Sequence, residues 1–584
     1  MKSLRQAFCL FSAGLLVMLA GCAGIPPESE PIDHGFRFQE ITKESGIDFI
    51  HEKDTFDEKL ARINPWFAST GAGVAVADYD RDGFMDLYFV NSKRGSKNVL
   101  YRNRGDGTFQ EVAEQAGVAN TNQEGIAQAA VWLDADNDGY SDLFVGKWGK
   151  SQLFHNNGNG TFTEVTEKAG VGYQGYVNKA ITLDYNRDGL LDLYLGCYFR
   201  ETDNLWNSAT TKVLYDDFER ARNGGRNVLY RNNGDGTFTN VAKETGVDDP
   251  GWTLATGSAD INNDGWPDLY NANDFGPDML YLNEKGKQFK PVVQKRGVGD
   301  DTFKGMNVDF ADLFHDGKLA FFVSNISKPT YLLEGNQLWH ENEQGQYVDR
   351  AQELGVIHSG FTWGGKFLDV DNSGNFSLAI ANGFISANPD KDYWFDMGIL
   401  ATTPGNVVED TKNWTPFEDK SMSGYEPKSL FLNQAGKMRD VAQEVGITFR
   451  DDARGVAAVD LKNEGVLDLV YANQGAPARV YKNIHTNQHN WIKLDLVGRA
   501  PSNRDAVGAR VTFTIDGVKT VMEKDGGNSH GAQSDPRLHL GMGKATRVSS
   551  ISIRWPSGRV QVLENVAANQ ILRIEEPDTA VPTR

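Results

Sequence analysis

Residues 77–90 read ADYDRDGFMDLYFV, and Asp78, Asp80, Asp82 and Asp86 fall within nine residues of this stretch. Carboxylates packed this closely raise one another's pKa values and destabilise a fold unless a positive charge lies among them. Calcium takes about six to eight oxygen ligands, and carboxylates at the first, third, fifth and ninth positions of a loop can surround it. The spacing therefore predicts a calcium-binding loop.

The residues on either side of this loop predict strands rather than helices. An EF-hand shares the first half of the spacing and the sixth-position glycine, here Gly83, but it requires flanking helices and a glutamate at the twelfth position. The twelfth residue here is Phe89, and the flanks VAVA (74–77) and LYFV (87–90) read as short buried strands. The loop is therefore expected to join two strands.

Three further copies of the loop follow, in LDADNDGYSDLFV (133–145), LDYNRDGLLDLYL (183–195) and ADINNDGWPDLYN (259–271). Where asparagine replaces aspartate it supplies a neutral oxygen, so all four loops can bind calcium, and we expect about four structural calcium sites. The predicted ligands beyond the first loop are Asp134, Asp136, Asp138, Asp142, Asp184, Asn186, Asp188, Asp192, Asp260, Asn262, Asp264 and Asp268.

Three more copies have lost part of the ligand pattern. The loop that begins at Asp312 has Phe314 at its third position, and we expect no metal there. The loop that begins at Asp460 has Lys462 at its third position, where the ammonium group can take the place of a cation among the carboxylates. The loop that begins at Asp369 has serines at its fifth and ninth positions, and its occupancy stays open.

A second repeated block follows each loop, first as NVLYRNRGDGTFQEV (98–112), and reads as strand, turn and strand. With the two strands around the loop, one repeat gives four strands, the unit of a propeller blade. The last loop is followed only by ARVYKN (478–483), and the matching half, FRFQEITKESGI, stands at 36–47. We therefore expect an all-β, seven-bladed β-propeller in which the N-terminal strand completes the last blade and leaves no open sheet edge.

These repeats resemble a known family. Residues 36–483 resemble an FG-GAP/VCBS-repeat propeller of the integrin-α type, and residues 484–584 resemble a small β-rich ASPIC/UnbV domain. The matching pieces of the tail are NRDAVGARVTF (503–513), HLGMG (539–543), WPSGRVQ (555–561) and NVAANQIL (565–572). The chain is thus similar to the cartilage acidic protein 1-like family, and this resemblance implies the fold and calcium binding more firmly than any activity.

The first 22 residues, MKSLRQAFCLFSAGLLVMLAGC, read as an export signal because a basic start precedes an apolar run too short to span a bilayer. Their ending resembles the lipobox of bacterial lipoproteins, in which the cysteine, here Cys22, carries the lipid. We therefore expect residues 1–21 to be a signal peptide and residues 22–35 to tether the folded body to a membrane. Ala23 after the cysteine favours the outer membrane of a Gram-negative cell envelope over retention in the inner membrane.

Charge and cysteine usage exclude two further classes. The formal net charge of −20, from 59 basic and 79 acidic residues, argues against nucleic acid as a partner, because a basic patch would be required. Of the three cysteines, Cys9 leaves with the signal and Cys22 carries lipid, so only Cys197 remains. A disulfide framework is therefore excluded.

The face opposite the calcium loops is the expected ligand face. Two long connections, 197–226 and 382–427, open there, and long loops without their own periodicity are more often functional than idle. Rings stack on sugars or anchor proteins, and cations near the pore mouth can capture an anionic ligand, although the same rings can pack the loops and the same cations can be solvated. The candidates are Trp66, Trp206, Trp252, Trp363, Trp394, Lys179, Lys304 and Arg454.

The sequence thus favours a calcium-binding, lipid-anchored cell-envelope protein that binds a protein or glycan through this face. The alternative is a carbohydrate-active enzyme, of the polysaccharide lyase or sugar dehydratase type, with a site at the propeller pore. Such chemistry needs a positioned base beside a cation, and His51 and His358 are the candidates. Their spacing does not single them out, and HExxH and P-loop patterns are absent from the sequence, so no catalytic residue is assigned.

Overall fold

The computed structural model describes residues 32–292, 298, 302–434 and 436–578. The expected signal peptide, Cys22 and most of the expected tether lie outside the described residues. Residues His34–Arg584 form one compact unit. No helix among the described residues is both long enough and apolar enough to cross a bilayer.

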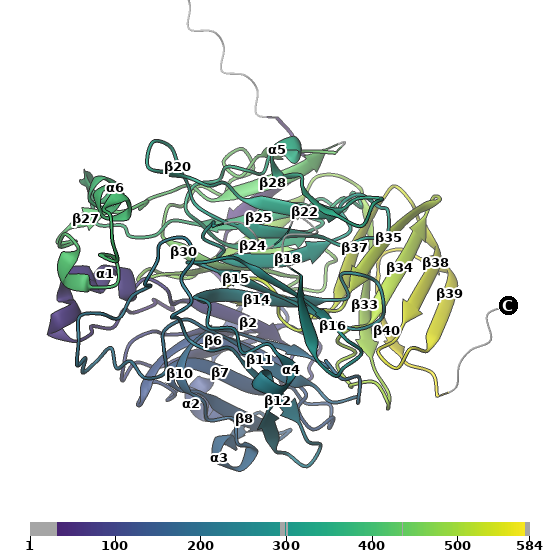
Figure 1. Cartoon of the computed structure of the whole chain (residues 1–584). Coiled ribbons are helices and arrows are strands. Elements are labelled where there is room, and N and C mark those ends of the chain that lie inside the picture. Colours follow the sequence, from purple (N-terminus) through teal and green to yellow (C-terminus); the bar gives the residue numbers. More distant parts are fainter. Residues whose placement is uncertain (1–31, 293–297, 299–301, 435, 579–584) are drawn as a thin grey trace, which may run out of the picture. The chain divides into compact units, whose positions relative to one another are not determined.

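The repeats fold into four-stranded antiparallel units, and seven of them can be traced in the described residues (Figure 1). The strands of the first four units are β2 (Gly73–Ala77), β3 (Asp86–Val90), β4 (Val99–Asn103) and β5 (Phe109–Glu111); β6 (Gly125–Leu133), β7 (Asp142–Lys150), β8 (Gln152–Asn156) and β9 (Phe162–Glu164); β10 (Gln174–Leu183), β11 (Asp192–Cys197), β12 (Val228–Asn232) and β13 (Phe238–Asn240); and β14 (Thr253–Ala259), β15 (Asp268–Asn273), β16 (Met279–Asn283) and β17 (Phe289–Val292).

The last three units are built in the same way. Their strands are β18 (Asn307–Ala311), β19 (Ala320–Ser324), β22 (Gln337–Glu341) and β23 (Tyr347–Asp349); β24 (Thr362–Leu368), β25 (Ser377–Asn382), β28 (Ser429–Gln434) and β29 (Lys437–Asp440); and β30 (Ala453–Val459), β31 (Asp468–Asn473), β32 (Arg479–His485) and β1 (Phe36–Glu40). Single-turn helices follow four of the units: α2 (Ala113–Ala116), α3 (Thr166–Ala169), α4 (Ala242–Thr245) and α5 (Ala351–Leu354).

The N-terminal strand completes the last unit, as the sequence predicts. β1 pairs antiparallel with β32, with Phe36 opposite His485 and Glu40 opposite Tyr481. The first strand of each unit contacts the first strand of the next unit, and β2 contacts β30, so the units close into a propeller-like ring. Because the two ends of the repeat region share one sheet, that sheet has no strand missing at the closure.

The C-terminal region adds two small sheets, drawn yellow in Figure 1. Their strand orders are β37-β33-β40 and β35-β34-β38-β39. Phe513, Ile551 and Trp555 belong to the buried cluster that the tail shares with the fifth and sixth units. The strands are β33 (Asn490–Val497), β34 (Arg510–Ile515), β35 (Val518–Glu523), β36 (Ala532–Gln533), β37 (Leu538–Gly543), β38 (Arg547–Arg554), β39 (Val560–Ala567) and β40 (Gln570–Glu575).

One segment of the tail, residues 525–535, enters the ring, and we call it the axial segment. β36 within it pairs in parallel with β2. A side chain at Gly526 would place its Cβ 1.7 Å from the Thr182 carbonyl oxygen, so this close approach requires glycine. The axial segment hydrogen-bonds to the first strand of every unit, at Val74, Trp132, Thr182, Ser258, Val308, Gly365 and Ala458. It therefore fills the centre of the ring.

Candidate metal-binding loops and candidate ligand face

The seven loops between the first and second strands share one backbone shape. In the first loop, the Asp78 carboxylate accepts hydrogen bonds from the amides of Asp82 (3.0 Å) and Gly83 (2.9 Å). The degenerate loop at Asp460 repeats both bonds, at 2.9 and 2.8 Å. The fourth residue of each loop is left-handed, as at Arg81 with φ 60°, and the sixth-position glycines also have positive φ. The first aspartate therefore shapes the turn whether or not a metal is bound.

The carboxylates of the first loop lie close to one another. Carboxylate oxygens of Asp78, Asp80 and Asp86 lie within 4.8 Å of one another. Asp80 Oδ1 is buried and has no hydrogen-bond partner. Burial, followed by the neighbouring carboxylates, raises the pKa of Asp78 to about 6, and burial raises that of Asp86 well above its usual range. An orphaned oxygen among repelling carboxylates fits a hard divalent cation such as calcium.

The other predicted loops share these electrostatics. Burial raises the pKa of Asp142 to about 8 and that of Asp184 to about 7. Burial and the charge of Asp505 raise the pKa of Asp134 to about 8. The ninth-position carboxylates of the third and fourth loops, Asp192 and Asp268, also have pKa values well above the usual range, chiefly because they are buried. All four loops thus present buried acids whose ionised forms need a counter-charge.

A recurring asparagine links the loops to one another. Asp86 Oδ1 accepts a hydrogen bond from the Asn103 amide (2.8 Å), and Asn103 Nδ2 donates to the Leu461 carbonyl in the loop of the neighbouring unit (2.8 Å). The same residue at the end of the third strand makes the same link in four more units, at Asn156, Asn232, Asn283 and Asn483. Sequence reasoning missed this role, although the asparagine recurs in every copy of the motif but that of the fifth unit.

The tail covers the face of the ring that carries these loops. Asp505 accepts from the Asp134 amide, Arg554 forms an ion pair with Asp260, and the Gly541 amide donates to Asp369. In the degenerate last loop, Lys493 of the tail lies 2.8 Å from Asp460. Lys462, the lysine predicted to lie among these carboxylates, contacts the fifth-position carboxylate Glu464 at 3.2 Å. The prediction is incomplete, because the ammonium at Asp460 comes from the tail.

Most of the aromatic residues predicted for the ligand face are buried. Trp66, Trp252, Trp363 and Trp394 are buried, and Trp206 is half-buried with its Nε1 donating to Asp54 at 2.7 Å. The expectation that these rings form an exposed surface is therefore wrong. They pack beneath and within three segments that we call the aromatic cover: residues 52–70, 197–226 and 382–427.

The segments of the aromatic cover meet over the ring. The Thr411 amide donates to the Thr211 carbonyl (2.8 Å), and the Phe417 amide donates to the Arg62 carbonyl (2.9 Å). The helices and short strands of the cover and of the neighbouring 327–333 hairpin are η1 (Glu58–Ile63), α1 (Asn64–Phe67), β20 (Ser327–Lys328), β21 (Leu332–Leu333), β26 (Asn388–Asp392), α6 (Trp394–Thr402), η2 (Thr411–Asn413) and β27 (Lys420–Ser421). The long loops thus cover the ring rather than stand apart on opposite sides of it.

The three candidate cations are also structural. Lys179 Nζ donates to the Ala532 carbonyl of the axial segment (2.9 Å), and burial lowers its pKa to about 7. Lys304 pairs with Glu334 at 2.8 Å and lies over the Phe218 ring. Arg454 donates to the carbonyls of Ser69, Gly383 and Phe384. The expectation that they capture an anionic ligand at the pore mouth is wrong, because their charges are buried against the chain itself.

The location that the enzyme alternative requires is filled by the axial segment. His51 is buried, its Nδ1 accepts from the Gly475 amide (3.1 Å), and burial lowers its pKa to about 3. His358 lies between α5 and β24, and its Nδ1 is 3.3 Å from the hydroxyl of Ser327, which belongs to the connection between β19 and β22. His530 lies within the axial segment and is buried.

Four apolar side chains on α6 and on the neighbouring 327–333 hairpin are exposed, and we call them the exposed apolar patch. The exposed fractions are 63% for Phe395, 53% for Ile399, 58% for Leu333 and 42% for Tyr331. Phe395 and Ile399 are four residues apart and so lie on one side of α6, whereas Trp394, Met397 and Leu400 are buried. The Tyr331 ring stacks over Trp394 with centroids 6.2 Å apart.

Comparisons with known proteins agree with the architecture. The FG-GAP-like repeat family matches residues 78–145, 134–195, 215–271 and 260–323, and the ASPIC and UnbV family matches residues 499–581. Cartilage acidic protein 1 of Xenopus tropicalis is 23% identical over 85% of this chain and 64% of the relative, and that of Homo sapiens is 22% identical over 94% and 71%. The chain therefore spans about two thirds of the length of these relatives.

A solved structure of an Agrocybe aegerita lectin, which recognises non-reducing terminal N-acetylglucosamine, is similar over 55% of this chain and 77% of the lectin, with 17% identity and a TM-score of 0.33. The chain is a propeller-like FG-GAP-repeat protein with a C-terminal ASPIC and UnbV domain, and it is related to the cartilage acidic protein 1 chains.

Proposed function

We propose that this chain is a calcium-binding, lipid-anchored cell-envelope protein that binds a macromolecule through the exposed apolar patch, on the face opposite the metal loops. An FG-GAP repeat region joined to an ASPIC and UnbV domain supports a binding or adhesion role. The loops would hold calcium in a structural role, with Asp78, Asp80, Asp82 and Asp86 as ligands in the first loop and the equivalent residues in the next three.

The exposed apolar patch is the observation that carries the proposal. The tail contacts the loop face, whereas the patch stands on connections that open on the opposite face. The patch stands on the connections between the second and third strands of the fifth and sixth units. Soluble proteins rarely gather large apolar side chains in one exposed place without a binding role. Ile399 and Leu333 are aliphatic and cannot stack on a sugar as rings do, which favours a protein ligand over a glycan.

Binding is tested with the soluble form that begins after Cys22. Glycan arrays and pull-downs from envelope fractions identify ligands of the parent, and each ligand is titrated against the double variant Phe395→Ser/Ile399→Ser. We expect at least a tenfold loss of affinity with an unchanged melting temperature. Val518→Ser, at a tail residue that is 51% exposed, is the matched control. Equal affinity of the double variant and the parent would refute the patch as the binding surface.

The lipid anchor is tested separately, because residues 1–31 lie outside the described structure. In a Gram-negative host, the mature protein should partition with outer-membrane vesicles and yield an N-terminal peptide with acyl groups on Cys22. The Cys22→Ala form should be released into the soluble fraction. An unmodified cysteine in the mature protein would contradict the anchor, while the binding surface could still stand.

A further inference from the structure

The residue before the recurring asparagine of the third strand faces the loop of its own unit in the first two units, and its type differs between units. It is Arg102 in the first unit and Arg231 in the third, but His155 in the second. Arg102 pairs with Asp80 and also with Asp82, at 3.2 Å. In the second unit an imidazole therefore stands where the first and third units have a guanidinium.

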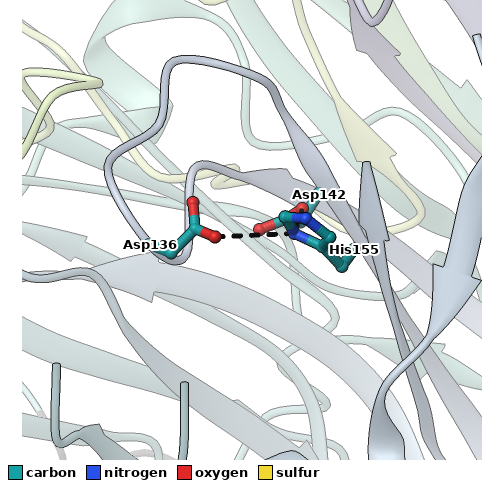
Figure 2. A group of neighbouring side chains, drawn as sticks. All are labelled: Asp136, Asp142 and His155. Atoms are coloured by element: carbon teal, nitrogen blue, oxygen red, sulfur yellow. Dashed lines mark ion pairs between the residues drawn. The ribbon is translucent and has the colours of Figure 1, made fainter. Parts of the chain in front are cut away.

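Figure 2 shows the His155 ring beside two carboxylates of the second loop. His155 Nδ1 lies 3.2 Å from Asp142 Oδ1 and 3.5 Å from Asp136 Oδ2. One ligand atom from each of the three residues falls within 4.8 Å of the others. Among the described residues, the two ion pairs are the polar contacts of the His155 side chain, while its backbone pairs with Thr163 in the sheet. Nδ1 of the ring therefore faces the carboxylates of the loop.

This set of donor atoms differs from a calcium site. Calcium takes oxygen ligands, whereas imidazole nitrogen is a ligand for zinc and other first-row transition metals, at about 2.0–2.1 Å. A guanidinium cannot coordinate a metal, because it has donors only and keeps its proton. The second loop alone thus adds a nitrogen ligand to its carboxylates among the described units that keep the full aspartate pattern.

The three side chains differ in how far they are buried and in how many hydrogen bonds fix them. Asp142 is 4% exposed, and its carboxylate accepts from the amides of Asn156 (2.7 Å) and Ala135 (3.1 Å), which fix its orientation. His155 is 34% exposed and Asp136 is 43% exposed. The site is therefore anchored on one side and open on the other, where an ion and its water ligands can enter.

The fifth unit provides an internal comparison. Its equivalent histidine, His340, lies 3.2 Å from Asp316, but its ring packs on Phe314 with centroids 4.2 Å apart. The ninth position of that loop is Ala320, so the second carboxylate is missing. A histidine in this position therefore does not make a site by itself, and only the second unit combines it with two carboxylates in the described residues.

We infer that the second loop binds a divalent transition metal of the Zn²⁺ class through His155 Nδ1, Asp136 and Asp142. The inference rests on the proposal above that these loops bind metal. For the second loop it adds transition metals to calcium as a class of bound cation. It needs no calcium in the other three loops, so the two proposals can fail separately.

The test measures zinc binding to the soluble form that begins after Cys22, first after chelation without added calcium and then in saturating calcium. His155→Asn replaces the imidazole with a neutral oxygen, and His155→Arg installs the residue of the first and third units. The parent should bind one more equivalent of Zn²⁺ than either variant, or bind it at least about tenfold more tightly. Calcium content is measured on the same samples, so a failure of the calcium sites is seen independently. Zinc affinities within twofold of the parent would overturn the inference.

A second measurement needs no variant and covers the case in which a substitution disturbs folding. In ¹⁵N-labelled parent protein, Zn²⁺ or Cd²⁺ should shift the Nδ1 resonance of His155, while His340 is the matched control and should not respond. Cobalt should give an absorption band of a nitrogen-containing site. An unresponsive His155 would mean that the imidazole is only a counter-ion to the carboxylates, and the inference would be wrong.

Discussion

The two faces of the ring are closed by different chemistry. On the loop face, buried carboxylates meet cations from the tail, such as Lys493 at Asp460 and Arg554 at Asp260. On the opposite face, the aromatic cover packs apolar rings such as Trp252 and Trp414 over the strands. Charge pairs depend on both partners and on bound ions, whereas apolar burial does not. The comparison therefore predicts that metals and tail cations control one face and leave the other unchanged.

Lys493→Ala should give the largest effect on the loop face. Lys493, Asp460 and Asp535 are all buried, so the substitution removes the ammonium group that pairs with Asp460, while Asp535 keeps its ion pair with Arg537. Removing one partner of a buried ion pair costs about 3–5 kcal/mol of unfolding free energy, which urea unfolding measures. Lys519→Ala, at an exposed position of β35, is the control and should change stability by less than about 0.5 kcal/mol. Equal effects of the two variants would show that the buried pair is unimportant.

Trp252→Ala tests the opposite face in the same assay. Its ring is fully buried against Tyr198 and Phe199, with centroids 4.9 and 5.2 Å away. Loss of a buried tryptophan costs about 3–5 kcal/mol, and this cost should be the same with calcium and with chelator. Phe395→Ala, at an exposed ring, should be nearly neutral. A Trp252→Ala penalty that depends on calcium would break the separation of the two faces.

Asn283→Ala tests the links between units at an intermediate scale. Asn283 Nδ2 donates to the carbonyls of Tyr185 (2.9 Å) and Pro267 (3.0 Å). The variant leaves buried acceptors unpaired, at a cost of about 1–3 kcal/mol in unfolding free energy. Hydrogen exchange should quicken first in β16 and in the loop at Asp184. A variant as stable as the parent would show that the link only accompanies the fold.

Asp274→Asn gives an effect that depends on pH. Burial raises the pKa of Asp274 to about 7, while the Tyr198 hydroxyl bonded to it favours the charged form. The unfolded value is about 3.9, so the stability from this group is complete below about pH 4 and is lost as the pH rises through 7. The melting temperature of the variant minus that of the parent should therefore increase as the pH is raised from 5 to 8. A difference that does not change with pH would contradict this assignment.

The elements that sequence reasoning predicted well are local patterns. The spacing of Asp78 to Asp86 gives both the loop and its flanking strands, and the half motif at 36–47 gives the closing strand, because each is specified by neighbouring residues. The burial of Trp252 and Lys179 could not be predicted in this way. It depends on contacts between distant segments, such as that of Lys179 with Ala532, 353 residues away.

The role of the tail could not be predicted from the sequence for the same reason. Gly526 and Gly531 allow the axial segment to approach Thr182 and Val74 inside the ring, and no local pattern in the sequence marks them for this role. A lysine among the carboxylates of the Asp460 loop was predicted from the nearby Lys462, whereas the contribution of Lys493 could not be predicted because it comes from the distant tail. The asparagine links had a visible signal in the repeat, although their partners lie in the neighbouring unit.

The central claim is that divalent ions stabilise the loop face, and one measurement tests it most directly. The soluble form that begins after Cys22 is assayed for bound metal and melted in calcium and in EGTA. Each occupied site adds about 2.7 kcal/mol when free calcium is a hundredfold above Kd, so the account predicts bound calcium and a melting temperature at least about 5 °C lower in EGTA, restored by calcium. A protein that carries no alkaline-earth metal and melts at the same temperature in both buffers would contradict the account.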